Sequence, residues 1–295
     1  MNAIAKPAGS VPLNAFTVDL EDWYQGLETG PEEWDGFEDR LATGTNRLLD
    51  LLDQCGVRAT FFVLGYAAER APRLVRRIHA RGHEIGTHGY SHGFVYQLGP
   101  DAFARDLARS LDILRNLVDA DIVGHRAPFF SITHQSPWAY RILVEHGIRY
   151  DSSVFPVRNY RYGMPDAPRT VYRTPEGLIE FPLTTLRLLG TNWPIAGGAY
   201  FRLLPYTVTR LGFIKAIRHG DPAVFYLHPW ELDPGHPRLD LPRRIRWPHY
   251  YNLTRTRERL FRLLRDFTFV PMREALESSG WLGQTTENSH DRPCQ

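Results

Sequence analysis

Two histidines, His88 and His92, stand four residues apart in the sequence THGYSH. On one helical turn such a pair can reach a single metal ion, and neutral imidazole is a common zinc ligand. Taken alone, the spacing is more typical of surface or loop histidines, because short motifs occur by chance. Glycines around the pair, together with an acidic cluster after another predicted strand, favour a metal site.

The acidic cluster is the tetrapeptide DLED, which carries Asp19, Glu21 and Asp22. A catalytic zinc typically has three protein ligands and an open position for water, so one carboxylate would complete a site that two histidines begin. Considered alone, the same cluster is equally typical of a solvated loop or of the negatively charged start of a helix.

Five predicted strands end in a charged or titratable residue. Parallel strands of a β/α barrel direct their C-terminal ends to one face, and barrel enzymes carry their chemistry there. Each residue also has a structural explanation, since His228 follows an apolar run and the sequence YDSS is ordinary turn chemistry. Five such endings together favour a functional face. The residues are Asp19, His88, Arg126, Asp151 and His228.

Strand-like and helical patterns alternate along most of the chain, which is typical of a parallel sheet with helical crossovers. Six to eight strands favour a closed or nearly closed barrel, although the pattern does not exclude an open sheet. We expect strands at 15–19, 59–65, 83–87, 122–126, 148–151, 177–184, 223–228 and 267–272. We expect helices at 44–56, 71–82, 100–118, 136–147, 205–220 and 254–266. Two long segments, 152–176 and 229–252, are predicted to be loops, and long loops are usually functional.

Composition excludes several classes of protein. The 295 residues are 43% hydrophobic and 23% charged, as in globular domains, and a net charge of +2 gives no electrostatic case for nucleic acid. The two cysteines form no disulfide framework or cysteine zinc motif. No apolar run reaches the length of about 18 residues that a membrane span needs. The first residues lack the apolar core of a signal peptide, so we expect a cytoplasmic location.

The motifs TVDLED, HGYSH, RAPF, YDSS and FYLH occur in this order. The set resembles the polysaccharide deacetylases of the NodB homology type, carbohydrate esterase family 4, over roughly residues 14–230. The stretches VDLEDWY and GGAYFRLLPY, with the basic C-terminal region, resemble the branch associated with exosortase-linked exopolysaccharide loci. The resemblance implies an α/β fold, a distorted (β/α) barrel. We place that barrel at 14–230, an extension packed on it at 231–280, and disordered ends at 1–13 and 281–295.

The resemblance also implies an activity, the metal-dependent removal of N-acetyl groups from an N-acetylhexosamine-containing polysaccharide. The expected cofactor is one divalent metal ion, zinc, and His88 and His92 match the metal-binding pair. The remaining matches are to the catalytic base (Asp19), the arginine beside it (Arg126), the general acid (His228), the acid that tunes this histidine (Asp151) and the backbone donor to the oxyanion (Phe129).

One departure from the family pattern concerns the third metal ligand. The common pattern has two adjacent acids, the base and then the ligand, but Leu20 follows Asp19 here. Strand alternation places Glu21 on the same face as Asp19, whereas Asp22 keeps the usual aspartate if the chain turns at once. Both Glu21 and Asp22 are therefore candidate ligands.

The expected partner is an N-acetylated glycan. The basic segment 238–262 could approach a lipid-linked, phosphate-bearing glycan or make peripheral contact with an anionic membrane, but a solvated basic face is the simpler explanation. Aromatic residues on the predicted loops could stack on sugars or belong to the core. They are Trp23, Tyr24, Tyr160, Tyr162, Trp193, Tyr200 and Trp230.

Two other functions stay open. One is a hydrolase on the same scaffold that acts on another amide, such as a cyclic ureide. The other is a non-catalytic glycan-binding protein. The presence of both proposed proton-transfer residues, Asp19 and His228, argues against the second, because a protein that only binds need keep neither.

Overall fold

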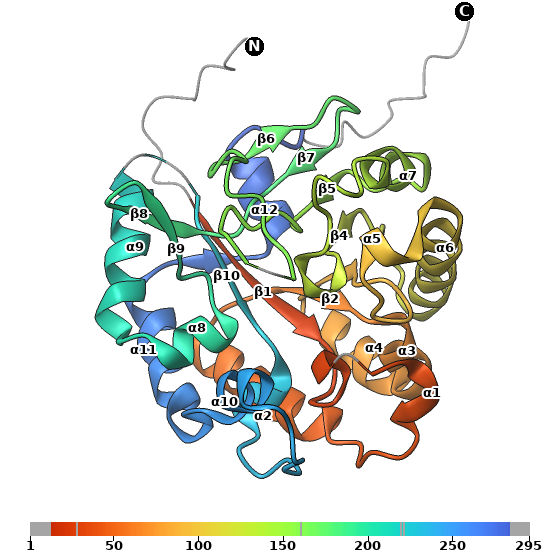
Figure 1. Cartoon of the computed structure of the whole chain (residues 1–295), viewed down its shortest axis with the longest axis horizontal. Helices are drawn as coiled ribbons and strands as arrows, with labels where there is room; N and C mark the ends of the chain where they lie inside the picture. Colours follow the sequence, from red (N-terminus) through yellow and green to blue (C-terminus); the bar gives the residue numbers. More distant parts are fainter. Residues whose placement is uncertain (1–12, 28, 160, 219, 221, 284–295) are drawn as a thin grey trace, which may run out of the picture.

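The computed structural model describes residues 13–283 of the chain except 28, 160, 219 and 221. Its central element is β1 (Asn14–Leu20), in which every residue is buried. β1 pairs in parallel with β2 (Thr60–Val63) on one side and with β10 (Val224–Leu227) on the other. Figure 1 shows β1, in red, running through the middle of the molecule with β10 beside it.

The main sheet has nine strands within the described residues, in the order β10-β1-β2-β3-β4-β5-β7-β6, with β11 also paired to β1. All its pairings are parallel except that of β6 with β7. The remaining bounds are β3 (Glu84–Thr87), β4 (Gly124–His125), β5 (Tyr150–Asp151), β6 (Tyr172–Arg173), β7 (Ile179–Glu180) and β11 (Phe269–Val270).

Irregular backbone bridges the two ends of the curled sheet. After β7, Leu183 N–H donates to the carbonyl of Val154 at 2.9 Å. The next residue, Thr184, accepts a hydrogen bond from Val224 N–H in β10 at 2.7 Å through its Oγ1. A separate hairpin, β8 (Thr185–Leu188) and β9 (Thr191–Pro194), follows. The distorted (β/α) barrel expected from the sequence is thus confirmed as a mixed α/β fold with a curled, half-barrel sheet.

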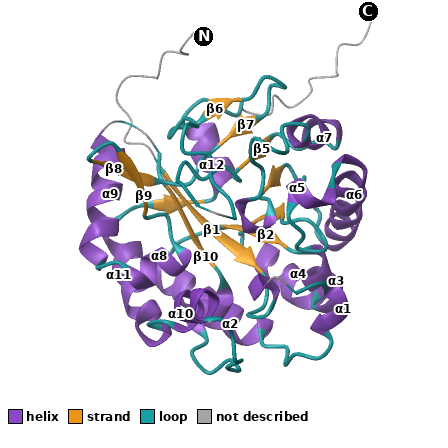
Figure 2. Cartoon of the chain, in the orientation of Figure 1, coloured by secondary structure: helices purple, strands orange, loops and turns teal. Residues whose placement is uncertain are grey.

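Helices surround the sheet (Figure 2). Their bounds are α1 (Pro31–Trp34), α2 (Leu41–Cys55), α3 (Gly65–Arg70), α4 (Pro72–Ala80), α5 (Val95–Leu98), α6 (Pro100–Leu117), α7 (Ala139–Glu145), α8 (Gly198–Leu203), α9 (Tyr206–Arg218), α10 (Arg243–Tyr250), α11 (Thr256–Asp266) and α12 (Met272–Ser278). Short 3-10 helices are η1 (Gln25–Leu27), η2 (Pro128–Phe130), η3 (Pro229–Leu232) and η4 (Leu253–Arg255). No helix among the described residues is long and apolar enough to cross a membrane.

Each of the eight expected strands and six expected helices is present in at least part of its range. The prediction of a loop at 229–252 was wrong, because this segment contains η3 and α10. The predicted disordered ends lie almost wholly outside the described residues, although Leu282 is described and buried. The division at residue 230 stays a prediction, and β11 beyond it pairs with β1.

Candidate active site

The C-terminal ends of the central strands meet at one mouth of the sheet. β1 carries Asp19 near its end, His88 follows β3, and His228 follows β10. Parallel neighbours in register bring these positions together, since Asp19 lies opposite Phe62 of β2, and Val63 opposite Thr87 of β3. A cavity of about 280 Å³ opens at this mouth. Its lining includes Asp19, Glu21, His88, His92, Phe129 and His228.

Three buried side chains form a metal-ligand cluster at the cavity. One donor atom from each of Glu21, His88 and His92 lies within 4.8 Å of the other two. Glu21 Oε2 contacts His92 Nε2 and lies 3.8 Å from His88 Nε2. His88 Nδ1–H donates to the backbone carbonyl of Arg126 at 2.7 Å, which leaves the Nε2 lone pair directed at the cluster. Metal-binding histidines are commonly oriented by such a bond.

The electrostatics of the cluster also fit a divalent cation. Burial lowers the pKa of His88 to about 4, so the imidazole is neutral, as a ligand must be. Burial alone would raise the pKa of Glu21, but nearby His92 and His228 outweigh it and lower the pKa to about 2. Glu21 Oε2 is buried without a hydrogen bond from the described residues. Two imidazoles and one carboxylate are a known ligand set of catalytic zinc.

Asp22, the alternative ligand, lies outside this cluster. Its Oδ2 accepts the backbone N–H groups of Arg40 and Leu41 at 2.7 and 2.9 Å. Its Oδ1 accepts Trp23 N–H at 2.8 Å. The carboxylate therefore satisfies free donors at the start of α2, as an acidic cap does, and has turned away from the histidines.

Arg126 and Asp19 form a fully buried pair. Arg126 Nη1 donates to Asp19 Oδ1 at 2.8 Å and to Thr17 Oγ1 at 2.7 Å. Its Nε and Nη2 donate to the carbonyl and the hydroxyl of Ser152 at 3.0 and 2.9 Å. The guanidinium also lies 4.4 Å from the ring centroid of Phe62. These contacts hold Asp19 in one orientation, in which its other oxygen, Oδ2, lies 3.9 Å from His228 Nε2.

His228 is held in place by an acid that the sequence analysis missed. Its Nδ1–H donates to Glu231 Oε1 at 2.9 Å, and Glu231 Oε2 accepts from Arg202 Nε at 2.6 Å. Its Nε2 lies 3.6 Å from Glu21 Oε1. Burial alone would lower the pKa of His228, but Glu21, Glu231 and Asp19 outweigh it and raise the pKa to about 9. The imidazole is therefore protonated at neutral pH when no metal is present.

The expected contact between Asp151 and His228 does not occur. Asp151 Oδ1 accepts from His125 Nδ1 at 2.7 Å and from the Ser153 hydroxyl at 2.7 Å. His125 of β4 and Asp151 of β5 are register partners, so their side chains leave the same face of the sheet. Glu231 takes the place predicted for Asp151. A signal for it was present in the sequence, because His-x-x-Glu has the spacing of a capping box, which the structure contains.

Glycines allow α8 to approach β10 and carry Arg202 to Glu231. Gly197 has φ 141° and forms a bridge with Tyr226. A Cβ atom on Gly197 would lie 1.8 Å from the Tyr226 carbonyl oxygen, so no other residue fits. From this start α8 brings Tyr200 to the cavity and Arg202 to the buried Glu231 carboxylate.

Strained backbone surrounds the histidine pair. His92, Phe129 and Phe130 have φ values of 55°, 55° and 54°, which side chains other than glycine rarely adopt. The Phe129 ring packs edge-on against His92 at 4.4 Å and stacks on Phe94 at 4.2 Å. Strain of this kind concentrates at functional sites. Phe129 lines the cavity, and the role of its backbone N–H toward an oxyanion stays a prediction.

The aromatic residues considered for sugar binding lie in different environments. Tyr162, Tyr200 and Trp230 line the cavity. Trp23 and Tyr24 are buried in the core. Trp193 is half exposed on the β8–β9 hairpin, and Tyr160 lies outside the described residues.

Two family models match successive parts of the chain. Residues 34–150 match the polysaccharide deacetylase model, and residues 152–277 match a domain of unknown function, DUF3473. The histidine pair of the metal cluster lies in the first range and His228 in the second. Asp19 and Glu21 precede both, so the cavity is assembled from all three parts of the chain.

Known proteins share parts of this sequence or its fold. A peptidoglycan-N-acetylglucosamine deacetylase of Bacillus cereus is 38% identical over 96 residues, which are 32% of this chain and 35% of the relative. The chain thus spans about a third of that relative's length.

Two solved structures show the fold. One, from Mycobacterium smegmatis, is assigned as a polysaccharide deacetylase; it has a TM-score of 0.65 and 22% identity, over 94% of this chain and 93% of that one. The other is a pseudoenzyme of carbohydrate esterase family 4 from Bacillus anthracis, with a TM-score of 0.52 and 13% identity, over 93% of this chain and 69% of that one. Residues 34–150 are thus similar to polysaccharide deacetylases and residues 152–277 to DUF3473, and the solved structures share the fold of the chain.

Proposed function

We propose that this protein is a metal-dependent hydrolase that removes N-acetyl groups from an N-acetylhexosamine-containing polysaccharide. The observation that carries the proposal is the close approach of three kinds of group in one cavity. His228 Nε2 lies 3.9 Å from Asp19 Oδ2 and 3.6 Å from Glu21 Oε1, and Glu21 belongs to the metal-ligand cluster. A base, an acid and a cation site are the parts that metal-assisted amide hydrolysis requires.

Glu21, His88 and His92 would hold the divalent cation, which we propose to be zinc from the ligand types. When bound, the cation supplies Lewis-acid polarisation of the acetamide carbonyl and lowers the pKa of water. The protein keeps the ligands ready for it by burying the carboxylate between the imidazoles and by fixing the His88 ring on the Arg126 carbonyl.

Asp19 is the proposed general base. Arg126 occupies its Oδ1, so Oδ2 is the oxygen that can accept a proton from the attacking water. The oxygen of that water forms a bond to the acetamide carbonyl carbon. Because Arg126 makes four hydrogen bonds from a fully buried position, the carboxylate cannot rotate freely, and its orientation contributes to the rate.

His228 is the proposed general acid. The carbon–nitrogen bond breaks as Nε2 gives its proton to the leaving amine, and acetate and the free amino sugar result. Glu231 keeps the other ring proton on Nδ1, which fixes the ring orientation and stabilises the imidazolium form. Arg202 in turn holds Glu231 from the opposite side.

The substrate is proposed to be an exopolysaccharide, in a lipid-linked form as one alternative. Support comes from the resemblance of VDLEDWY and GGAYFRLLPY to an exopolysaccharide-associated branch. The name of the Bacillus cereus relative makes peptidoglycan the competing substrate. Tyr162, Tyr200 and Trp230 line the cavity in which a sugar would bind. The cytoplasmic location and a peripheral membrane contact stay predictions.

Acetate release from N-acetylglucosamine oligomers, peptidoglycan fragments and isolated exopolysaccharide tests the proposal. The zinc-loaded protein should release acetate from at least one of them, and a chelator should abolish the release. Asp19→Asn is the matched control, because it retains the metal ligands. Hydrolysis of a cyclic ureide without acetate release would identify a different hydrolase. Glycan binding without turnover of any substrate would identify a binding protein, as the fold of the Bacillus anthracis pseudoenzyme allows.

A further inference from the structure

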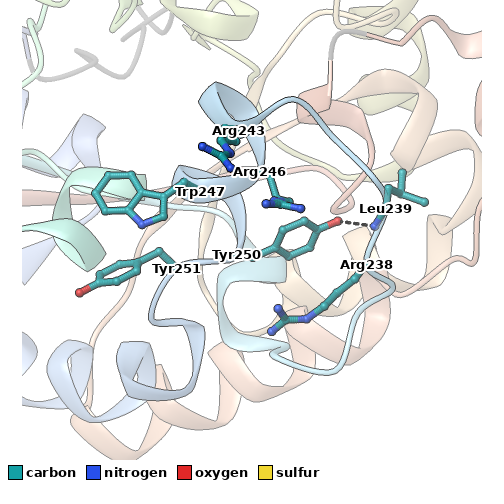
Figure 3. Close-up of a pocket in the computed structure, with 7 residues that line it drawn as sticks. All are labelled: Arg238, Leu239, Arg243, Arg246, Trp247, Tyr250 and Tyr251. Carbon is teal, nitrogen blue, oxygen red and sulfur yellow. Dashed lines mark hydrogen bonds between the residues drawn. The ribbon is translucent and has the colours of Figure 1, made fainter.

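A second cavity lies on the other side of α10 from the candidate active site. Its volume is about 580 Å³, and Figure 3 shows its lining. α10 is the wall between the two cavities, because Arg244, Ile245, Pro248 and His249 line the active-site cavity. The outer cavity is lined by Arg238, Leu239, Arg243, Arg246, Trp247, Tyr250 and Tyr251. The two sets alternate along α10 with helical periodicity, so each occupies one face of the helix.

The outer cavity carries positive charge without acidic partners. Arg238, Arg243 and Arg246 are all exposed, and none has a carboxylate within ion-pair distance in the part of the chain that is described. By contrast, Arg40 and Arg47 both bind Asp233. Figure 3 shows Arg246 and Arg238 flanking the ring of Tyr250 in this view. Such unpaired guanidinium groups are available to an anionic ligand.

Exposed aromatic rings line the same cavity. Trp247 is 59% exposed and Tyr251 is 41% exposed, and their ring centroids lie 5.2 Å apart. Large aromatic side chains left in water beside a concavity are typical of binding sites. The Tyr250 hydroxyl accepts Leu239 N–H at 3.0 Å and donates to the Pro237 carbonyl at 3.2 Å. These two bonds attach the loop that carries Arg238 to α10, so the cavity is held together by specific contacts.

We propose that the outer cavity binds a negatively charged sugar of the same glycan whose acetamido group reaches the candidate active site. This inference rests on the proposed function and specifies its substrate as an acidic polysaccharide. Guanidinium forks match the geometry of carboxylate and phosphate oxygens, and the aromatic rings offer faces to the sugar. α10 is about 10–12 Å across with its side chains, so a nearby unit of one chain can reach over it. Arg244, on the active-site side, continues the positive charge along that path.

A membrane surface is the competing occupant, because arginine, tryptophan and tyrosine also occur where proteins touch lipids. The concave shape favours a glycan, since a single sugar chain can enter a cavity that a flat bilayer surface cannot fill. The position of the outer cavity next to the active-site cavity, with α10 as their shared wall, also favours a glycan.

The test compares two substrates that differ in charge. Neutral N-acetylglucosamine oligomers are compared with hyaluronan-type oligomers, in which glucuronate alternates with N-acetylglucosamine. The double variant Arg243→Ala/Arg246→Ala should raise KM for the acidic oligomer about tenfold or more. The kcat for this oligomer and the KM for the neutral oligomer should stay unchanged. Trp247→Ala should weaken the binding of both substrates. The matched control is Arg73→Ala/Arg76→Ala, which removes two exposed arginines at the same spacing from α4.

Calorimetry separates this inference from the proposed function. Asp19→Asn protein should bind the hyaluronan-type oligomer, and adding Arg243→Ala/Arg246→Ala should weaken binding about tenfold, whether or not the wild type releases acetate. Equal losses for neutral and acidic oligomers, or no loss, would overturn the inference. Binding to phosphatidylglycerol vesicles that the double variant alone abolishes, with oligomer binding unchanged, would assign the cavity to a membrane instead.

Discussion

Glu231 Oε1 accepts both ring and backbone N–H groups of His228, at 2.9 and 3.0 Å, from a position three residues further along the chain. The carboxylate thus holds the imidazole by its Nδ1 side and leaves Nε2 facing Asp19 and Glu21. Burial alone would raise the pKa of Glu231, but Arg202 and His228 outweigh it and lower the pKa to about 2, so the carboxylate stays charged. The contact with Glu231 thus helps to keep His228, the proposed general acid, protonated.

Glu231→Gln should therefore shift the basic limb of the pH–rate profile. Loss of the negative charge lowers the pKa of His228 by about 1 to 3 units, so the protonated form disappears at lower pH. We expect the basic limb of kcat/KM to move to lower pH by that amount, and NMR titration of His228 to report the same shift. Asp151→Asn should leave the limb in place, because Asp151 binds His125. The opposite pattern would restore Asp151 as the tuning acid.

Substitutions of Glu21 and Asp22 should differ in their effects on metal content and on stability. Glu21→Gln is expected to lose the bound metal, as is the double variant His88→Ala/His92→Ala. Asp22→Asn is expected to retain one metal per chain but to lower the free energy of unfolding by about 1–2 kcal/mol, because both carboxylate oxygens accept backbone N–H groups and the amide has only one oxygen. Elemental analysis and urea denaturation measure the two effects. Metal loss in Asp22→Asn with retention in Glu21→Gln would contradict the assignment of the cluster.

Substitution of Asp19 or His228 should lower the rate of hydrolysis and leave the metal content unchanged. Neither belongs to the ligand cluster, so Asp19→Asn and His228→Ala should keep one metal per chain. A positioned general acid or base contributes about 10²–10⁴-fold, and kcat/KM should fall by a factor in that range. Near-normal activity in His228→Ala would remove it from the mechanism, and metal loss in either variant would show that the ligand set is larger.

The raised pKa of His228 should also make the free energy of unfolding depend on pH. A group whose pKa is raised from 6.5 to about 9 by folding stabilises the native state fully below pH 6.5, and this contribution is lost as pH rises through about 9. In chelator-treated protein the loss between these pH values amounts to roughly 3 kcal/mol for His228 alone. Urea denaturation of wild type and His228→Gln at both pH values measures it. A wild-type difference no larger than that of the variant would contradict the raised pKa.

The central part of the fold could be predicted because its sequence is simple. β1 and β2 are short strands rich in apolar residues, and burial on both faces explains their composition. β3 is less apolar, but it lies between two helical patterns. The β8–β9 hairpin was missed because each strand has only four residues and β9, with the sequence TNWP, has no apolar pattern typical of a strand. α10 was missed because Pro248 and several arginines are typical of a loop, yet the proline falls in the last turn of the helix.

The candidate site was predictable at strand ends and less so beyond them. Motif and position identified His88 and His228 because strand ends converge whatever the loops do. The choice between Glu21 and Asp22 depended on how the chain turns after β1, which is decided by distant donors at Arg40 and Leu41. The partner of His228 depended on a turn in η3, so Asp151 was chosen where Glu231 is found.

The pairing of β1 with β10 has a consequence for how the chain acquires its structure. Ala15 is register partner to Val224, so residues more than two hundred positions apart must meet before the central strand has both neighbours. Contacts of such sequence separation form slowly, since the loop must close before the pairing stabilises it. During synthesis on the ribosome, one edge of β1 stays unpaired until Val224–Leu227 have emerged. Unpaired strand edges can pair with other chains and cause aggregation. We therefore expect truncations that end between residues 151 and 223 to aggregate, even though they contain the whole polysaccharide deacetylase match.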